Sequence, residues 1–354
     1  RGRAFHCRYC CRGSRPSRLT YIIANGSCSY SRLMPTILDH SIEDTFMRSI
    51  VLLSAAFALG ACAETNPSAT TATTATTAQD PVTTISEPMS KPQPAGLDAI
   101  LAAQPNAVQA RYTFRNPAQT LAFFDIEPGM TVVEALPGGG WYSKLLLPYL
   151  GDEGTLIGAN YSLDMQRLFS FRTEEQLKKL ETWTTDWPAK ASTWVEDNNT
   201  PISGFFFGAQ PESVAGSADA VLFIRALHNL ARYQSQGDFL TIAIDNAYTA
   251  LKPGGVVGVV QHQMREEAPD AWADGSRGYL KQSFVVAQME AAGFVFEGAS
   301  NVNANPNDQP QEGDVVWRLP PTLMGSRDNP EAAAAMQAIG ESNRMTLKFR
   351  KPAA

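Results

Sequence analysis

The chain has no cysteine after residue 62. It contains five cysteines in 354 residues, and all of them lie near the beginning of the chain: Cys7, Cys10, Cys11, Cys28 and Cys62. The rest of the chain can therefore form no disulfide and can use no cysteine nucleophile. The group Cys7, Cys10 and Cys11 has no second pair of ligands at a suitable spacing, so we expect no metal site.

Basic residues are scarce beyond the first part of the chain. The formal charge is −6, and the first 61 residues hold eight Lys/Arg against three Asp/Glu, which leaves 21 against 32 in the remainder. Proteins that bind nucleic acids or anionic membranes use clustered cations on their surface. We therefore expect no nucleic-acid partner and no basic membrane-binding face on the folded part.

The sequence also lacks an apolar run long enough to cross a bilayer. Ile50–Leu59 is too short to span and follows the basic start Met47-Arg48-Ser49, an order that is typical of a signal peptide. The run ends in LGAC, which resembles the bacterial lipobox and implies a lipid anchor on Cys62. An ordinary signal peptide that contains a cysteine is the alternative. Because Ala63 is not aspartate, the resemblance implies a periplasm-facing lipoprotein at the outer membrane.

Composition divides the chain into four parts. Residues 1–46 are rich in Arg, Ser and Cys without periodicity and are interpreted as a non-native or disordered leader, and residues 47–61 are the signal peptide. Residues 62–95 are rich in Thr and Ala, with few large apolar groups to bury, and are predicted to be a flexible tether. Residues 96–354 are expected to form the folded domain.

Strand and helix patterns alternate from residue 131 onward. Strands are expected at Thr131–Leu136, Thr155–Asn160, Gly204–Phe207, Ala218–Arg225, Gly255–Gln261, Phe294–Ser300 and Thr346–Arg350. Helices are expected at Trp141–Leu150, Leu163–Trp183, Asp238–Leu251 and Gln282–Ala292. This alternation predicts an α/β fold, a doubly wound, mostly parallel seven-stranded sheet with helices on both faces, whose ligands bind beyond the carboxyl ends of the strands.

Two segments flank this pattern. Before the first strand, Leu97–Ala103 and Pro117–Phe124 read as helices, with Asn116 as the N-cap of the second. The arginines and aromatics of Arg111–Arg115 are interpreted as a solvated helix face rather than a cover over a site. Between the last two strands, residues 301–344 are long for a connection, and we expect a packed excursion with one flap rather than a lid.

The stretch TVVEALPGGGWY, Thr131–Tyr142, predicts a strand, a glycine loop and a helix. Glycine has no Cβ and reaches positive φ at little cost, so such a loop lets a nucleotide-like ligand approach the backbone. The alternative is a loop that is only a tight connection. Polar residues end the other strands: Asn160, then Arg225 and His228, then His262. A histidine there suits proton transfer, but a buried histidine without a catalytic part is the alternative.

Together these segments resemble the ordered motifs of class I S-adenosylmethionine-dependent methyltransferases. The resemblance is carried by VVEALPGGGWYSKLLLPYLGDEGTLIGAN, DAVLFIRALHNL, LKPGGVVGVVQH and MEAAGFVFEGAS, and it covers roughly residues 97–351. The chain is more closely similar to an exported group of predicted methyltransferases with PGGGWY in the first loop. The usual loop has glycine where this chain has Leu136, and Asn160 stands where the family has a ribose-binding acid.

The resemblance implies a methyltransferase that uses S-adenosylmethionine and acts on an unidentified small molecule. The methionine part of the cofactor would lie against Glu134 and the loop Pro137-Gly138-Gly139-Gly140, and the ribose near Asn160. His228 would be the base where the acceptor must lose a proton, and Arg225 would pair with a carboxylate in the cleft or on a ligand. The alternative is a non-catalytic periplasmic binding lipoprotein that keeps the fold.

The lipobox generates the first testable prediction. Metabolic labelling with a fatty acid should label the chain and place it in the membrane fraction, because Met47–Cys62 has a basic start, an apolar centre and a cysteine in the correct order. The variant Cys62→Ser should carry no label and leave that fraction. A Cys62→Ser variant that stays labelled and membrane-bound would refute the anchor.

Overall fold

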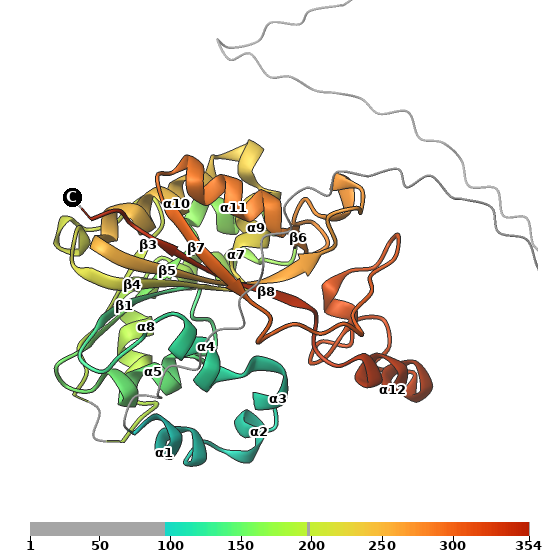
Figure 1. Ribbon diagram of the computed structural model, residues 1–354, viewed down its shortest axis with the longest axis horizontal. Helices are drawn as coiled ribbons and strands as arrows, with labels where there is room; N and C mark the ends of the chain where they lie inside the picture. The colour runs from blue at the N-terminus through green and yellow to red at the C-terminus, as the bar shows by residue number, and fades with distance from the viewer. Residues whose placement is uncertain (1–95, 197–198, 354) are drawn as a thin grey trace, which may run out of the picture. The chain divides into compact units, whose positions relative to one another are not determined.

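The computed structural model describes residues 96–196 and 199–353 of the chain. A mostly parallel sheet lies at the centre of this part (Figure 1). Its strands are β1 Thr131–Ala135, β2 Thr155–Asn160, β3 Ile202–Phe206, β4 Ala218–Ile224, β5 Leu251–Met264, β6 Leu280–Lys281, β7 Val295–Ser300 and β8 Arg344–Arg350. They follow the order β3-β2-β1-β4-β5-β8-β7, and β6 pairs with β5 beside this path. Strand β8 is antiparallel to both of its neighbours.

This sheet confirms the expected α/β class and corrects one detail. The described residues form an eight-stranded sheet, whereas the sequence predicts seven strands. The additional strand, β6, has two residues, which are too few to show a periodic pattern. The leader, the signal peptide and the tether predicted for residues 1–95 lie outside the described residues.

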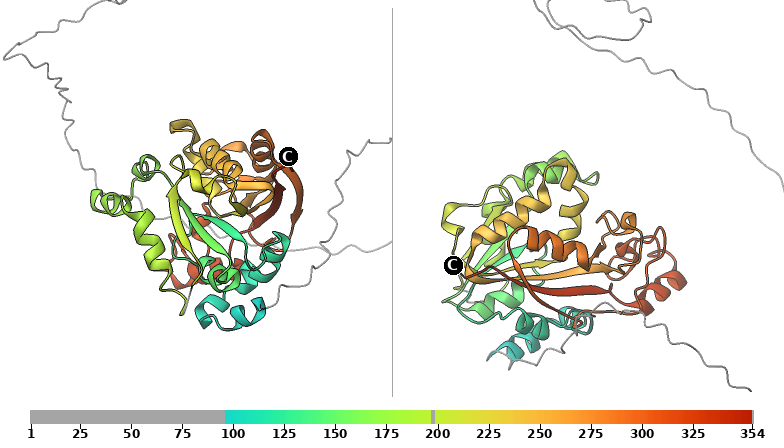
Figure 2. Two further views of the ribbon diagram at one scale, coloured as in Figure 1. Left: turned by 90° about the vertical axis from the view of Figure 1, so that its left-hand side faces the viewer. Right: turned by 45° about the horizontal axis from the view of Figure 1, so that its top comes forward.

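Helices cover both faces of the sheet (Figures 1 and 2). One apolar cluster packs on the face that carries α1 Leu97–Ala102, α4 Pro117–Phe123, α5 Ser143–Leu150 and α8 Trp183–Ala191. A second cluster packs on the face that carries α6 Leu163–Arg167, α9 Leu227–Arg232, α10 Phe239–Ala250 and α11 Gln282–Ala291. The remaining helices are α2 Asn106–Gln109, α3 Tyr112–Arg115, α7 Glu174–Leu180 and α12 Pro330–Ile339. No helix within the described ranges is both long and apolar enough to cross a membrane.

The expectation of one helix over Leu163–Trp183 is wrong. The structure has α6 and α7 in this range, and α8 begins at its last residue. Thr173 begins α7 with a capping box, in which its hydroxyl accepts from the Gln176 backbone N–H and the Gln176 side chain accepts from the Thr173 N–H. Satisfying these free N–H groups favours a new helix start over continuation of the previous helix.

Two strand glycines let aromatic rings of the covering helices lie directly on the sheet. A Cβ built on Gly158 of β2 would come within 2.6 Å of the Trp187 ring, and a Cβ on Gly258 of β5 within 2.5 Å of the Phe124 ring. Both rings are buried, with 4% and 0% of their surface exposed. The short distance between helix and sheet on this face therefore depends on glycine at these two positions.

Residues 301–343 lie between β7 and β8, at the edge where the parallel strands end (Figure 1). They contain a 3-10 turn, Val316–Arg318, and the helix α12. Leu319, Asp308 and Ser342 are almost completely buried, with 1%, 3% and 3% exposed. The packing of this excursion is confirmed, whereas its flap stays a prediction, and it stands beside the edge at which doubly wound folds bind ligands.

Candidate active site

The glycine loop lies between β1 and α5 and contains three left-handed residues. Leu136, Gly138 and Gly140 have φ angles of 54°, 54° and 74°. The Leu136 N–H donates to the Ala159 carbonyl of the neighbouring strand at 2.7 Å, and the Gly140 N–H donates to the Pro137 carbonyl at 2.8 Å. Leu136 therefore keeps the conformation that glycine favours, although a side chain there adds about 1 kcal/mol of strain.

Gly139 differs from its neighbours Gly138 and Gly140, which both have a positive φ. Its φ lies outside the left-handed range, and a Cβ built on it meets nothing within 4 Å. A Cβ on Gly140 would instead collide with the Trp194 ring. Gly138 and Gly139 are exposed, whereas Pro137 and Gly140 are buried. The open space beside the loop is therefore at Gly139, where a ligand can approach the backbone.

Glu134, the last residue but one of β1, is a buried carboxylate next to this loop in the sequence. Its side chain is 4% exposed, and its Oε2 accepts a hydrogen bond from the Ser143 hydroxyl at 2.6 Å. Burial raises the pKa of Glu134 to about 7, although the Ser143 bond and the positive charge of Arg225 act in the opposite direction. The group is therefore poised to ionise when a cation arrives beside it.

Asn160 lies at the end of β2, as expected, but its oxygen is already bound within the chain. The Oδ1 atom accepts from the Tyr161 N–H at 2.8 Å and from Gln166 Nε2 at 3.4 Å. Its Nδ2 makes no hydrogen bond within the described residues and is the part that remains for a ligand. A pocket of about 560 Å³ lies nearby, lined by residues that follow β2 and β3, including Ser162, Asp164 and Phe207. Its volume suits a nucleoside-sized ligand.

The structure brings the two histidines together. His228 lies in α9 and His262 in β5, with ring centroids 5.5 Å apart. His228 Nδ1 is 3.4 Å from Gln261 Oε1, and His262 Nδ1 is 2.6 Å from the Ser342 hydroxyl oxygen. Burial lowers the pKa of His228 to about 4 and that of His262 well below its usual value. Both rings are therefore neutral at pH 7 and can accept a proton or a hydrogen bond.

Arg225 follows β4 in a left-handed conformation, with φ of 57°. Its backbone N–H donates to the Val260 carbonyl at 2.6 Å, but its guanidinium makes no hydrogen bond or ion pair within the described residues. Burial lowers its pKa to about 9, and the nearby Arg115 and Arg344 lower it further. No ion pair between this guanidinium and a carboxylate is present among the described side chains, although its charge acts on Glu134, and pairing with a ligand carboxylate stays a prediction.

The interpretation of Arg111–Arg115 as a solvated helix face is wrong. Arg115 is 4% exposed, its guanidinium carbon lies 4.4 Å from the centroid of the Trp141 ring, and its Nε donates to Glu341 Oε2 at 3.4 Å. Arg111 Nε donates to Glu341 Oε1 at 2.6 Å. Arg344 also pairs with Glu341. The buried carboxylate thus holds the segment before β1 against the excursion.

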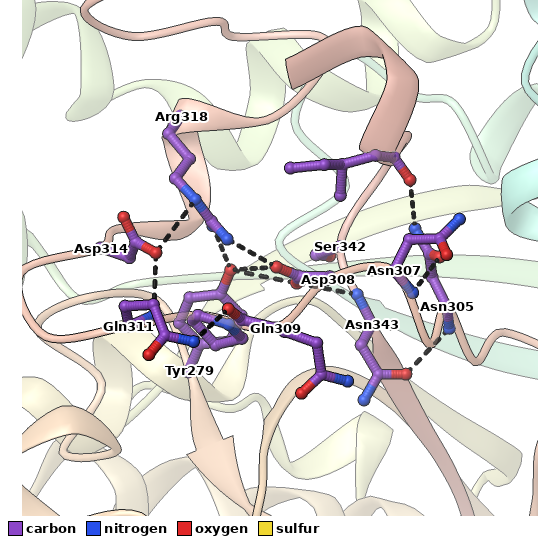
Figure 3. Close-up of polar contacts among 12 residues, drawn as sticks. Tyr279, Asn305, Asn307, Asp308, Gln309, Gln311, Asp314, Arg318, Ser342 and Asn343 are labelled. Carbon is purple, nitrogen blue, oxygen red and sulfur yellow. Dashed lines mark hydrogen bonds and ion pairs between the residues drawn. The ribbon is translucent and has the colours of Figure 1, made fainter. Parts of the chain in front are cut away.

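A second polar network fixes the turn between β5 and α11. The buried Tyr279 hydroxyl donates to Asp308 Oδ2 at 3.1 Å and accepts from Arg318 Nη1 at 2.8 Å (Figure 3). Asp308 also accepts from Arg318 Nη2 at 2.9 Å and from the Asn343 N–H at 3.0 Å. In the same turn, a Cβ on Gly275 would collide with the His228 carbonyl. The turn therefore packs closely on α9, and the excursion holds it there.

Asn116 occupies the N-cap position of α4, but its side chain does not cap the helix. Its Nδ2 donates to the Val302 carbonyl at 2.7 Å instead, and its own φ is 37°. Glu341 and Arg344, which complete the cluster around Arg115, are missed by the sequence analysis. They lie more than 220 positions from Arg115, and no periodic pattern or motif surrounds Glu341. Only the three-dimensional contact shows that these charges belong to one site.

Comparisons with known proteins give matches among solved structures. No protein-family model and no curated protein matches the chain. Similar solved structures include a SAM-dependent methyltransferase from Aquifex aeolicus, with 12% identity over 72% of this chain and 98% of that one and a TM-score of 0.43. An arsenic(III) S-adenosylmethionine methyltransferase from Chlamydomonas reinhardtii has 14% identity over 73% and 74%, with a TM-score of 0.38. The cyclase SpnF has 16% identity over 68% and 81%, with a TM-score of 0.41. These values are too low to transfer an activity.

The buried histidines generate a prediction on acid stability. In the unfolded chain His228 takes up a proton below about pH 6.5, whereas in the fold it stays neutral until about pH 4. As the pH falls from about 6.5 to about 4, the free energy of unfolding should therefore decrease by up to about 3 kcal/mol. In His228→Gln, the slope of this free energy against pH should be shallower. Urea unfolding at pH 7.0, 6.0 and 5.0 measures the slope.

The comparison between wild type and variant is necessary because Glu134 acts in the opposite direction. Its raised pKa stabilises the fold below pH 4.5, and this stability is lost as pH rises toward 7. This contribution is the same in both proteins and cancels in the difference. Equal slopes for wild type and His228→Gln would show that His228 titrates normally.

Proposed function

We propose that the chain is a class I S-adenosylmethionine-dependent methyltransferase that acts on a small molecule. The observation that carries this proposal is the loop Leu136–Gly140, with three left-handed residues and open space at Gly139, next to the buried carboxylate of Glu134. The loop stands at the carboxyl edge of β1, where doubly wound sheets bind nucleotide-like ligands. The sequence motifs around this loop support the same family.

The residues present fit the cofactor in most of its parts. Glu134 would face a cationic group of the ligand, and the exposed backbone at Gly138 and Gly139 would contact its amino-acid part. The free Nδ2 of Asn160 and the pocket lined by Ser162 would receive the nucleoside part. S-adenosylmethionine, when bound, supplies a methyl group on a sulfonium. The protein's contribution to methyl transfer is chiefly the positioning of the acceptor.

His228 is the proposed base for an acceptor that must lose a proton. Its Nδ1 faces Gln261, and its other ring nitrogen makes no hydrogen bond within the described residues. Burial keeps the ring neutral above about pH 4, so its nitrogen can receive a proton, although the same burial makes it a weaker base than an exposed histidine. The ring centroid of Trp317 is 5.9 Å from that of His228. Trp317 and the turn that contains Tyr279 enclose this side of the site.

The compartment is proposed on the sequence alone. We infer an exported, periplasm-facing lipoprotein, held at the outer membrane through Cys62, because the lipobox follows a signal-peptide pattern. The small-molecule acceptor is part of the same proposal, since the folded part has a net negative charge and lacks the cation surplus of nucleic-acid-binding proteins.

Gly139→Val tests the proposed cofactor site. The added side chain fills the open space beside the loop, so it should weaken binding of S-adenosylhomocysteine at least tenfold, about 1.4 kcal/mol. Because residue 139 does not need a positive φ, valine is compatible with its backbone, and the melting temperature should stay nearly unchanged. Isothermal titration calorimetry with S-adenosylmethionine and S-adenosylhomocysteine measures the affinity.

Gly139→Ala and Gly140→Ala are the matched variants. Gly139→Ala adds one methyl group and should weaken binding less than valine does. Gly140→Ala should lower the melting temperature, because the methyl group collides with Trp194 at a left-handed position. Wild-type affinity in Gly139→Val, or no binding of either ligand by the wild type, would refute the proposed function.

Glu134 gives the proposed site a pH dependence. Its pKa is about 7, and only the ionised form attracts a ligand cation, so binding of S-adenosylhomocysteine, which keeps the amino group, should strengthen as pH rises from 6 to 8. Below pH 7 the affinity should fall by up to about tenfold per pH unit. Glu134→Gln should bind more weakly and with a flat profile. An unchanged profile in this variant would exclude Glu134 as the titrating group.

A further inference from the structure

A polar pocket of about 240 Å³ lies between α3, the residues that follow β7 and the end of α12, and we call it the amide pocket. Thr113 and Ser342 contribute hydroxyl groups to its lining, and Phe114 contributes an aromatic ring. It shares no lining residue with the larger pocket at Ser162 that is proposed for the nucleoside. Five residues of its lining carry carboxamides: Asn116, Asn303, Asn305, Asn307 and Gln337.

The amide pocket offers no unpaired charge. Glu341 is the only charged residue among the described residues that line it, and its carboxylate pairs with Arg111, Arg115 and Arg344, none of which lines the pocket. Although burial acts to raise the pKa of Glu341, these arginines lower it to about 2. A charged ligand would therefore be desolvated here without an unpaired partner of opposite charge, which is unfavourable. The pocket suits a neutral ligand.

Several polar groups of the amide pocket have no hydrogen-bond partner within the described ranges. The buried Asn303 donates through Nδ2 to Thr120 Oγ1 at 2.9 Å and to Thr346 Oγ1 at 3.0 Å, but its Oδ1 accepts no hydrogen bond. Asn307 and Gln337 are exposed, and their side chains make no hydrogen bond in this part of the chain either. An acceptor that is buried without a donor is destabilising, so the Oδ1 of Asn303 calls for a donor from outside the described chain.

Carboxamides suit a ligand that carries several hydroxyl groups. Each carboxamide offers N–H donors and an oxygen acceptor, and each hydroxyl both donates and accepts, so neighbouring carboxamides can bind both parts of one hydroxyl group. Phe114 offers an apolar surface to the C–H groups of a ring. The volume of about 240 Å³ lies below the roughly 300–1,000 Å³ of pockets for drug-sized ligands, so the ligand should be about one ring in size.

The walls of the amide pocket are fixed by contacts within the chain. Asn305 Nδ2 donates to the Ile339 carbonyl at 2.8 Å, and Asn305 Oδ1 accepts from the Asn307 N–H at 3.1 Å (Figure 3). Gly340 has no side chain, and a Cβ built on it would come within 2.6 Å of the Phe114 ring. These contacts hold the excursion against α3 before a ligand arrives, which reduces the entropy lost on binding.

Ser342 connects the amide pocket to the two histidines, since it lines the pocket and its hydroxyl oxygen is 2.6 Å from His262 Nδ1. We propose that the amide pocket binds a neutral, polyhydroxylated small molecule, a monosaccharide or a cyclic polyol, through the carboxamides of Asn303, Asn307 and Gln337. This site is separate from the proposed cofactor site and does not depend on the proposed function.

D-Glucose and myo-inositol are the probes, and cyclohexanol, a six-membered ring with a single hydroxyl group, is the control ligand. Each is titrated against the full chain by isothermal titration calorimetry and by ligand-observed NMR. The melting temperature does not serve as the readout, because sugars and polyols stabilise most proteins by exclusion from their surface. At least one of the two probes should bind, and cyclohexanol should not.

Gln337→Ala and Asn307→Ala test the proposed contacts. Both residues are exposed and their side chains make no described hydrogen bond, so the melting temperature should stay at the wild-type value. Each variant should weaken binding of the probe about threefold to tenfold, the effect of one lost hydrogen bond. Gln119→Ala is the matched control, because Gln119 is an exposed glutamine of α4 that does not line the pocket, and its affinity should be unchanged.

Ala338→Phe tests the place of binding. Ala338 is an exposed residue of α12 that lines the amide pocket, so the larger side chain should occupy the space of the ligand and abolish binding without disturbing the core. Ala335→Phe makes the same change at an exposed position of the same helix outside the lining, and it should bind as wild type does. Melting temperatures of both variants show that they are folded.

Four results would overturn the inference. They are a wild type that binds neither probe, cyclohexanol that binds as tightly as the probes, a folded Ala338→Phe variant with wild-type affinity, and displacement of the probe by S-adenosylhomocysteine, which would assign the probe to the cofactor site. Failure of the proposed function looks different. In that case S-adenosylhomocysteine does not bind, while probe binding and its dependence on Gln337 persist.

Discussion

The ion pairs of Glu341 hold the two ends of the folded chain together. One buried carboxylate accepts from Arg111 and Arg115, which precede the first strand, and from Arg344, which begins the last. Because Glu341 would be an unpaired buried charge without these arginines, its burial and the docking of the segments that carry them depend on each other. Their meeting fixes the excursion against the carboxyl edge of the sheet. The walls around His228 and His262 depend on that placement, since Ser342 contacts one histidine and Trp317 packs on the other.

The candidate site combines local strain with burial. Leu136 and Arg225 both have left-handed backbones, and they directly follow the neighbouring strands β1 and β4. Each N–H nevertheless bonds to an adjacent strand, Leu136 to Ala159 and Arg225 to Val260. The sheet therefore holds both residues in conformations that their side chains disfavour. The loops that follow β1 and β4 therefore lie at the same edge of the sheet. Glu134 lies in β1 near this edge, where burial keeps its pKa near neutrality.

Much of the fold follows from local sequence pattern. Strand β2 is predicted at its exact bounds, and β1 and β4 each within one residue, because β-branched and aromatic runs bounded by turns are local signals. The break between α6 and α7 is not recognised, since a capping box at Thr173 competes with a continuous helical period. The site divides in the same way. Glu134 and the glycine loop form one contiguous motif, whereas Arg115, Glu341 and Arg344 belong together only through long-range contacts that no local pattern encodes.

The direction of β8 explains why the segment before it borders the ligand edge of the sheet. A strand that runs antiparallel to β5 must begin at the edge where β5 ends, so whatever precedes it is brought to the ligand edge. Here β8 begins at Arg344, paired with His262. Any segment inserted between β7 and β8 therefore becomes a wall of the site without altering β1, β2 or their loops. Under the proposed function, the excursion would set which acceptor binds, while the glycine loop and Glu134 would hold the cofactor.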